Sequence, residues 1–342
     1  MEYLLPYCSS QRQLSCIRNE LLSLWKENRI FFESVFVTGN AKKLKGEKIK
    51  YLLESGLLQI ESNKYFFSPY RIIKYEKLFL ITDRFDNPSK NRVFPLSKDE
   101  SLYLACKLKV QHGINVLDFG TGCGIFALVS LQMGAKLVVA VEVNLRAIYF
   151  AKLNAQLNSL AGGLEIIFPH ELEEYPANKF DLICTDPPVV PCPPNSGLFV
   201  HSDGGPYGTV HLENIIEKVP KLLKSNGYFQ LVTLALGTDK SNLLEDLLRI
   251  YLSRIQFSYN IYNRYSRPLI NLTILYDYFK SSSNYISWQQ ELNDKKFKCL
   301  HYFYCEAKRD GCGFIGRQSI KIQKSKNSGT WEKRLRRLFF AF

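Results

Sequence analysis

The sequence contains few methionine and tryptophan residues, two and three in 342, and no long apolar run. No stretch reaches the roughly 18 consecutive apolar residues that a membrane-spanning helix needs. The first residues also lack the basic start and the apolar run of a secretory signal. We therefore expect a cytoplasmic protein that has no membrane partner.

The cysteines lack the arrangement of a disulfide framework or of a zinc site. They number nine, which is odd, they are scattered along the chain, and no Cys-x-x-Cys pair occurs. Cys299, His301, Cys305 and Cys312 come nearest to a zinc site, but their spacing matches no compact zinc motif. We expect reduced thiols and no metal ion.

The composition is that of a globular protein, with 46% hydrophobic, 13% aromatic and 23% charged residues. A chain of this length exceeds the usual size of one hydrophobic core, so we expect a catalytic domain with appended modules. The net charge of +13 is concentrated in the flanks. Lys and Arg outnumber Asp and Glu by 16 to 10 in residues 1–92 and by 13 to 5 in 281–342, against 16 to 17 in 93–280. Basic flanks suit a polyanionic partner or simply solubility, and charge alone names no partner.

Residues 1–92 are expected to form an N-terminal domain that is helical and winged-helix-like. Apolar residues repeat at helical spacing over 13–36 and 47–58, and two short strands, 57–61 and 64–67, follow as a hairpin. A polar stretch before residue 93 marks the domain boundary. Such a domain either reads DNA, or packs over a substrate cleft or forms a homodimer, and we favour the second kind of role.

Residues 93–310 are predicted to form an α/β domain with a Rossmann-like sheet. Apolar strands and helices alternate there, which is typical of a parallel sheet with helical crossovers. We expect strands at 114–118, 137–142, 164–168, 180–185 and 228–235, and helices at 125–133, 144–158, 211–224 and 240–252. Further strands are expected in three aromatic and β-branched runs, at 255–262, 270–279 and 299–306. The basic residues 311–342 would form a tail, either a short amphipathic helix or a binding segment.

A glycine-rich turn joins the first of these strands to the helix that follows. Asp118 ends the strand, and Gly120, Thr121, Gly122 and Gly124 precede the helix. Glycine lets the backbone approach a ligand closely and turn sharply into a helix. A dinucleotide-binding fingerprint would need its third glycine one residue later, and a P-loop would need a Gly-Lys-Ser/Thr that the chain lacks. Both of these alternatives are therefore disfavoured.

Acidic residues end two later strands. Glu142 ends the strand at 137–142, where a carboxylate can accept hydrogen bonds from both ribose hydroxyls of an adenosyl group. Asp186 ends a buried strand and is followed by Pro187 and Pro188. The glycine turn, Glu142 and Asp186 follow one another along the chain at the ends of predicted strands, and such an arrangement rarely arises by chance.

With these motifs the chain resembles the class I S-adenosylmethionine-dependent methyltransferases, and among them the HemK-like or small-domain group. The fourth motif of that group reads Asn/Asp-Pro-Pro-aromatic, and the resemblance covers roughly residues 93–280. The segments 93–100, which contains a proline, and 203–208, which is similar to a Gly-Gly-x-x-Gly turn, add weaker support.

S-adenosylmethionine is the cofactor that the resemblance implies. Glu142 would hold its ribose, with Asp118 and Asn144 assisting. His170 and Glu171, which follow the third strand, would lie beside the adenine. The residues of the glycine turn would surround its amino-acid part: Gly120, Thr121, Gly122 and Gly124.

The resemblance places Asp186 between the cofactor and the methyl acceptor. Its carboxylate would accept a hydrogen bond from the acceptor, while Pro187 and Pro188 would aim backbone carbonyls at it, so that a nitrogen lone pair faces the methyl group. Val189 and Asp203 would border the substrate. Many members have an aromatic residue where this chain has Val189, which puts a planar acceptor in doubt.

Three functions follow from this interpretation. The first is a methyltransferase that modifies a nitrogen or oxygen of a protein or nucleic acid. The second is a natural-product methyltransferase, in which the N-terminal domain and the aromatic residues 255–290 enclose a small molecule or peptide. The third is a non-catalytic nucleic-acid-binding module with a degenerate cofactor site, which the intact acidic positions disfavour.

Overall fold

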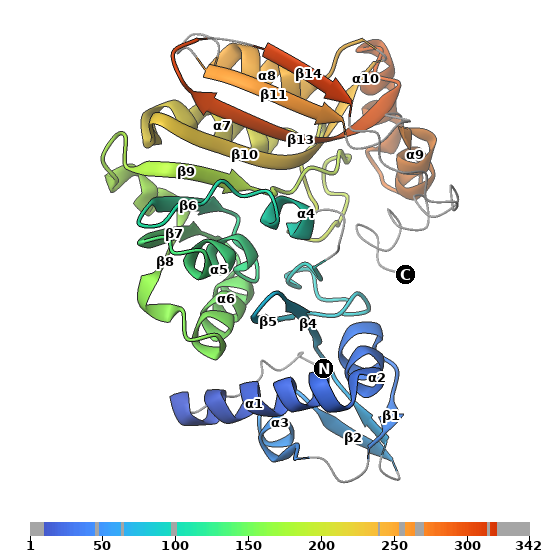
Figure 1. The fold of residues 1–342 in the computed structure, drawn as a ribbon. Helices are drawn as coiled ribbons and strands as arrows, with labels where there is room; N and C mark the ends of the chain where they lie inside the picture. The colour runs from blue at the N-terminus through green and yellow to red at the C-terminus, as the bar shows by residue number, and fades with distance from the viewer. Residues whose placement is uncertain are drawn as a thin grey trace.

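The computed structural model of the chain has a small N-terminal part at one end and a large sheet at the other (Figure 1). The expected tail after residue 319 and residues 97–100 of the proline-containing segment lie outside the described residues. Among the described helices, none is long and apolar enough to cross a bilayer. The described residues are 10–44, 48–62, 65–96, 101–238, 240–252, 257–263, 270–312 and 315–319.

A mixed sheet, with nine strands among the described residues, forms the larger part of the molecule (Figure 1). Its strands are β6 (Asn115–Phe119), β7 (Leu137–Val141), β8 (Leu164–Ile167), β9 (Phe180–Thr185), β10 (Leu223–Gly237), β11 (Phe257–Asn263), β12 (Ile270–Asn271), β13 (Cys299–Arg309) and β14 (Ile315–Ser319). The order across the sheet is β8-β7-β6-β9-β10-β13-β11-β14, with β12 paired to β13. The pairs from β8 to β10 are parallel, whereas β13 is antiparallel to both β10 and β11. The Rossmann-like prediction is thereby confirmed.

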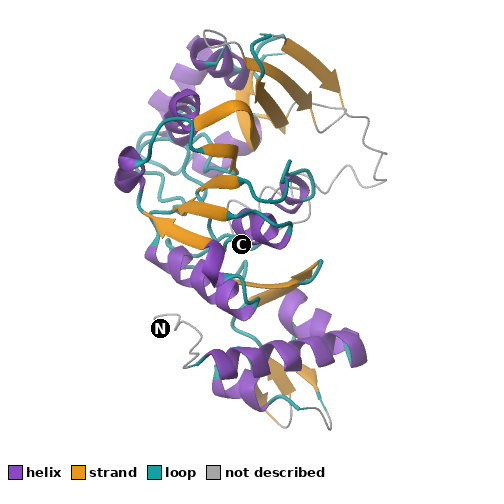
Figure 2. Ribbon diagram, turned by 60° about the vertical axis from the view of Figure 1, so that its left-hand side comes forward, coloured by secondary structure: helices purple, strands orange, loops and turns teal. Residues whose placement is uncertain are grey.

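Helices cover both faces of this sheet (Figure 2). The parallel strands consist largely of buried β-branched and aliphatic residues, as strands covered on both faces require. One apolar layer includes α5 (Ile125–Gln132) and α6 (Leu145–Leu157), and the other includes α7 (Val210–Leu222) and α8 (Leu243–Tyr251). Shorter helices are α4 (Ser101–Ala105), η2 (Ala161–Gly163) and η3 (Pro169–Glu174).

The run at 270–279 was expected to be a strand, and this prediction is wrong for most of its length. Only β12 is extended, and α9 (Thr273–Phe279) and α10 (Tyr285–Asp294) follow it. The reason is packing: Leu275 and Phe279 lie four residues apart, on one face of α9, and both are buried. Phe279 contacts Trp288 of α10 edge-on, with ring centroids 5.5 Å apart. Part of the expected tail, β14, instead joins the large sheet beside β11.

The N-terminal part contains the predicted helices and hairpin. Its elements are α1 (Gln11–Glu27), α2 (Arg29–Phe32), the π-helical η1 (Glu33–Thr38), β1 (Lys42–Lys43), α3 (Lys50–Glu54), β2 (Gln59–Ser62) and β3 (Tyr65–Phe67). The strands form a small antiparallel sheet in the order β1-β3-β2. Ser10 caps α1, because its hydroxyl accepts a hydrogen bond from the Gln13 N–H. The winged-helix interpretation of this part stays a prediction.

A second hairpin, which the sequence did not suggest, connects the two parts. It consists of β4 (Arg71–Tyr75) and β5 (Leu78–Thr82). Two buried asparagines, one in α6 and one at its C-cap, bond to the backbone of β5. Asn158 bonds to the N–H and C=O of Phe79, and Asn154 bonds in the same way to Ile81 at 2.9 and 3.0 Å. Asn154 also donates to the Cys123 carbonyl in the glycine turn, so one side chain holds both the hairpin and the turn.

Candidate cofactor and acceptor site

A cavity of about 400 Å³ lies at the carboxyl ends of β6, β7 and β9. The order of the sheet reverses there, since the chain passes from β8, at one edge, to β9 on the other side of β6. Ligands of open α/β sheets bind at such switch points. The cavity is lined by the glycine turn, the residues after β7, the segment after β9, one face of α7 and the segment 92–96.

The glycine turn presents bare backbone to the cavity. Gly120 and Gly122 both line it, with φ of 69° and 55° that side chains rarely adopt. A Cβ atom at either position would meet no atom within 4 Å, so both positions face open space. Gly124 has a different role: it precedes α5 with φ 89°, and a Cβ there would lie 3.4 Å from the Ala151 side chain. Gly124 packs against α6 and does not line the cavity.

Asp118 lies beneath the glycine turn and outside the cavity lining. Its Oδ2 atom accepts hydrogen bonds from the Thr121 hydroxyl at 2.6 Å and from the Ala127 N–H at 3.2 Å. The carboxyl is completely buried, and this burial raises its pKa to about 7. The structure thus shows Asp118 holding the turn from the core side, while Thr121 reaches the cavity.

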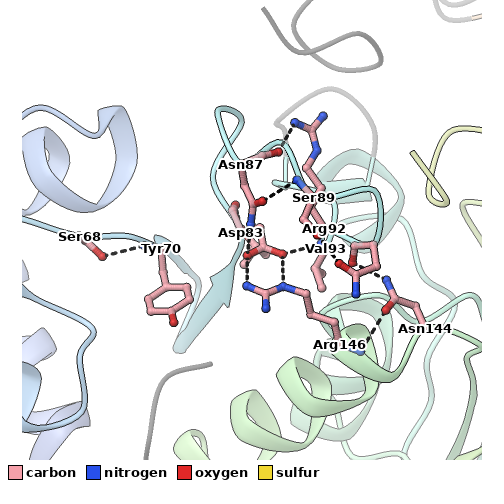
Figure 3. Close-up of polar contacts among 11 residues, drawn as sticks. Ser68, Tyr70, Asp83, Asn87, Ser89, Arg92, Val93, Asn144 and Arg146 are labelled. Atoms are coloured by element: carbon pink, nitrogen blue, oxygen red, sulfur yellow. Dashed lines mark hydrogen bonds and ion pairs between the residues drawn. The ribbon is translucent and has the colours of Figure 1, made fainter. Parts of the chain in front are cut away.

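Glu142 lines the cavity beside the turn, and backbone donors fix its carboxylate. Oε2 accepts from the Gly122 N–H at 2.9 Å, and Oε1 accepts from the N–H groups of Val143 and Asn144 at 2.8 and 3.0 Å. Asn144 also lines the cavity, caps α6 through the Arg146 N–H and donates to the Asn91 carbonyl (Figure 3). The carboxylate is therefore immobilised with its charge at the cavity wall.

The segment after β9 forms the opposite wall. Asp186, Pro187, Pro188 and Val189 all line the cavity. The Ser101 hydroxyl, at the start of α4, donates to Oδ2 of Asp186 at 2.6 Å. The carboxylate that the sequence singled out is thus oriented by a residue that the sequence did not identify.

Asp203 does not line the cavity. Its Oδ1 atom accepts from the Gly205 N–H at 2.9 Å and so shapes the glycine-containing turn after β9. That turn packs tightly on the cavity wall, because a Cβ on Gly204 would lie 2.8 Å from Val189 Cα and one on Gly208 would lie 2.5 Å from the Val189 carbonyl oxygen. Asp203 therefore supports the cavity wall indirectly, by holding the turn that packs against Val189.

His170 and Glu171, which were expected beside the adenine, also lie outside the cavity lining. Their neighbours Pro169 and Leu172 line the cavity. These two share a side because η3 is a 3₁₀-helix with three residues per turn. Glu171 instead accepts a hydrogen bond from the Phe168 N–H at 2.6 Å and caps the helix.

The sequence interpretation also missed three polar residues of α7 that line the cavity. His211, Asn214 and Lys218 recur at helical spacing, which was a detectable signal for one polar face. Within the described residues, no group of three metal-ligating side chains comes together.

A buried ion pair holds the segment before the cavity to α6. Both Asp83 oxygens bond to the Arg146 guanidinium, at 2.5 and 2.7 Å (Figure 3). Asp83 also accepts from the Val93 N–H at 2.7 Å and from the Asn87 amide at 2.9 Å. The carboxylate of Asp83 therefore links α6 to the segment that begins the cavity wall at residue 92.

The chain matches one family model and several known proteins. Residues 98–263 match the family model described as the methyltransferase small domain. A putative protein N5-glutamine methyltransferase of Methanocaldococcus jannaschii is 31% identical over 155 residues, which are 44% of this chain and 77% of that protein. A ribosomal protein L11 methyltransferase of Tolumonas auensis is 32% identical over 114 residues, which are 33% of this chain and 38% of that protein. The chain spans most of the first relative but less than half of the second. Among solved structures, M. jannaschii TYW2 in complex with AdoMet aligns over 73% of this chain and 89% of that one, with a TM-score of 0.43 and 14% identity.

Proposed function

Because the chain belongs to the class I S-adenosylmethionine-dependent methyltransferases that carry the methyltransferase small domain, we propose a role for each group of residues around the cavity. The protein is an S-adenosylmethionine-dependent methyltransferase, and S-adenosylmethionine is its cofactor. The observation that carries the assignment of the site is that Glu142 and Asp186 lie at the ends of different parallel strands yet line one cavity with the glycine turn.

The cofactor fits the side of the cavity that Gly120, Gly122 and Glu142 form. The two glycines leave open the space that side chains would fill, so a ligand can lie against the backbone. The Glu142 carboxylate, held by three N–H groups, is placed to accept from the ribose hydroxyls. We assign the adenine to Pro169 and Leu172 in place of His170 and Glu171. Asp118 and Gly124 support the turn without touching the ligand.

Asp186, Pro187 and Pro188 would position the acceptor. S-adenosylmethionine supplies the methyl group: the acceptor lone pair forms the new bond as the carbon–sulfur bond breaks, its electrons stay on sulfur, and an N–H proton is released. Asp186 accepts a hydrogen bond from that N–H and so orients the lone pair, and the two rigid prolines fix the wall around it. Ser101 fixes the carboxylate in turn.

We propose a protein side-chain nitrogen as the acceptor. One relative is named for glutamine and another for a ribosomal protein. In the cavity, the carboxylate of Asp186 lies near the apolar side chain of Val189 and can accept a hydrogen bond from an N–H of the substrate. We also propose that the protein belongs to the HemK-like group and acts in the cytoplasm. The N-terminal part would cover the acceptor or join two copies of the chain.

Calorimetric titration with S-adenosylmethionine and S-adenosylhomocysteine tests the shared premise of these assignments without knowledge of the acceptor. We expect saturable binding with a stoichiometry of one. Labelled cofactor would then identify the acceptor among ribosomal proteins, nucleic acids and peptides. A well-folded protein that binds neither ligand would contradict the proposal and favour a non-catalytic module.

A further inference from the structure

A buried arginine forms part of the cavity wall and has an unused donor. Arg92 lines the cavity, and its Nη1 donates to the carbonyls of Phe85 and Asn87 at 2.6 and 3.3 Å. Nε donates to Nε2 of His201 at 3.2 Å, and the guanidinium carbon lies 3.6 Å from the centroid of the Phe199 ring. No described residue accepts a hydrogen bond from Nη2, although this atom is buried. A buried donor without a partner is unusual in a folded protein.

The positive charge of Arg92 also lacks a bonded counter-ion. Asp83 is the carboxylate with the largest favourable electrostatic effect on it, but the Asp83 oxygens already bond to Arg146, Asn87 and Val93. Burial lowers the pKa of Arg92 to about 10, so the guanidinium still carries its charge at neutral pH. A buried cation is costly unless something compensates it. Asp83, Asp86 and Tyr278 act on Arg92 through space, and the direct contacts described above are with carbonyls, an imidazole and an aromatic face.

His201 is a weak substitute for an anion at this position. Burial and the nearby charge of Arg92 lower the pKa of His201 to about 3, so the ring is neutral at physiological pH. Its Nδ1 lies 2.9 Å from the Ser202 hydroxyl, and its ring stacks on Phe199. His201 can thus accept the Nε–H of Arg92, but it supplies no negative charge.

The nitrogen that bonds to His201, Nε, and the nitrogen without a partner, Nη2, lie on the same edge of the guanidinium. Nε and Nη2 present parallel N–H bonds on that edge, a fork that matches the two oxygens of a carboxylate. We propose that this edge of Arg92 binds a carboxylate group of the methyl acceptor, which replaces His201 as the partner of Nε and supplies the missing partner of Nη2. This inference rests on the proposed function and narrows the acceptor to a side-chain nitrogen with a carboxylate nearby, as in a C-terminal residue.

The location favours the acceptor over the cofactor as the source of the carboxylate. His201 and Phe199 belong to the loop that follows Asp186 and Val189, which is the acceptor side of the cavity. The glycine turn, which we assign to the amino-acid part of the cofactor, lies after β6. A nucleic-acid backbone fits less well, because Lys218 is the one other lysine or arginine among the described residues of the lining.

The test uses the full-length protein saturated with S-adenosylhomocysteine. Calorimetry compares N-acetylglutamine, which has a free carboxylate beside an amide, with N-acetylglutamine amide, which is neutral. We expect the wild type to bind the carboxylate probe at least tenfold more tightly. Arg92→Gln should abolish this preference. Arg92→Lys, which keeps the charge but not the fork, should lose most of it, and both variants should keep their affinity for S-adenosylhomocysteine within about twofold of the wild type.

Several results would overturn the proposal. One is a wild type that binds the two probes equally or binds neither; another is an unchanged preference in both variants. Weaker binding of S-adenosylhomocysteine by the variants, with unchanged binding of 5′-methylthioadenosine, would assign the fork to the carboxylate of the cofactor. Tighter binding of inorganic phosphate than of acetate would assign it to a phosphate. If the wild type binds no S-adenosylhomocysteine at all, the proposed function itself fails, and this outcome is visible before any probe is added.

Discussion

The hydroxyl of Ser101 donates a 2.6 Å hydrogen bond to Oδ2 of Asp186, and both residues line the cavity. Ser101→Ala removes this bond, which is worth about 1.5 kcal/mol or more because the acceptor is a carboxylate. We expect kcat to fall about tenfold with little change in the affinity for S-adenosylmethionine. Ser101→Thr, which keeps the hydroxyl, should restore most of the rate. A loss of cofactor affinity in place of rate would contradict a positioning role.

Asp186→Ala should stop turnover and spare cofactor binding, because the carboxylate is assigned to the acceptor. Single-turnover transfer of a labelled methyl group measures the first effect, and calorimetry measures the second. If the variant retains the wild-type rate, Asp186 does not position the acceptor.

Glu142→Ala should weaken S-adenosylmethionine binding at least about a hundredfold, since two hydrogen bonds from the ribose to a charged carboxylate would be lost. Glu173→Ala is the matched control: this glutamate is exposed and outside the cavity lining, so its removal should leave the affinity unchanged. Retained affinity in Glu142→Ala would remove Glu142 from the site.

The pKa of Asp118, raised by burial to about 7, predicts a pH dependence of stability. Between about pH 4 and 7 the folded protein holds a proton on this carboxyl that the unfolded chain has released, so the free energy of unfolding falls as pH rises. The full difference is at most about 4 kcal/mol. Asp118→Asn removes the titration and keeps an acceptor for Thr121 and Ala127. Urea unfolding measures the free energy of unfolding at pH 5 and at pH 8. Its decrease between the two pH values should be smaller in Asp118→Asn than in the wild type, and equal decreases would count against the raised pKa of Asp118.

The buried pair of Asp83 and Arg146 makes a further prediction. Arg146→Met leaves the Asp83 carboxylate buried without its cation, and we expect the free energy of unfolding to fall by about 3–5 kcal/mol. The double variant Asp83→Asn/Arg146→Met removes both charges of the pair and should lose clearly less. Chemical denaturation checks both, and a double variant less stable than Arg146→Met would show that the charge itself is not the cause.

The parallel strands and the glycine turn could be predicted because their signals are local. A strand buried on both faces reads as a continuous apolar run, as Leu137–Val141 does, and a turn that needs positive φ reads as glycine. Aromatic runs are less informative. Residues 273–279 form a helix because Leu275 and Phe279 pack as a helical pair, which single-residue strand preferences do not register.

The missed features depend on contacts between distant residues. Ser101 meets Asp186 across 85 positions, and the hairpin β4–β5 is fixed by asparagines more than 70 positions away. Pro169 and Leu172 line the cavity, and His170 and Glu171 do not, because a short 3₁₀-helix follows β8 and its phase is not visible in the sequence. Patterns of spacing cannot supply such pairings.

The side-chain amides of Asn154 and Asn158 bond to β5 as a neighbouring strand would, each taking one N–H and one C=O. They close an edge that would otherwise be open to strands of other molecules. A truncated protein that begins at residue 93 would keep both amides but lose the backbone they bond to, leaving polar groups unpaired in what had been the interior. An expression design that removes the first 92 residues should therefore yield an aggregation-prone protein.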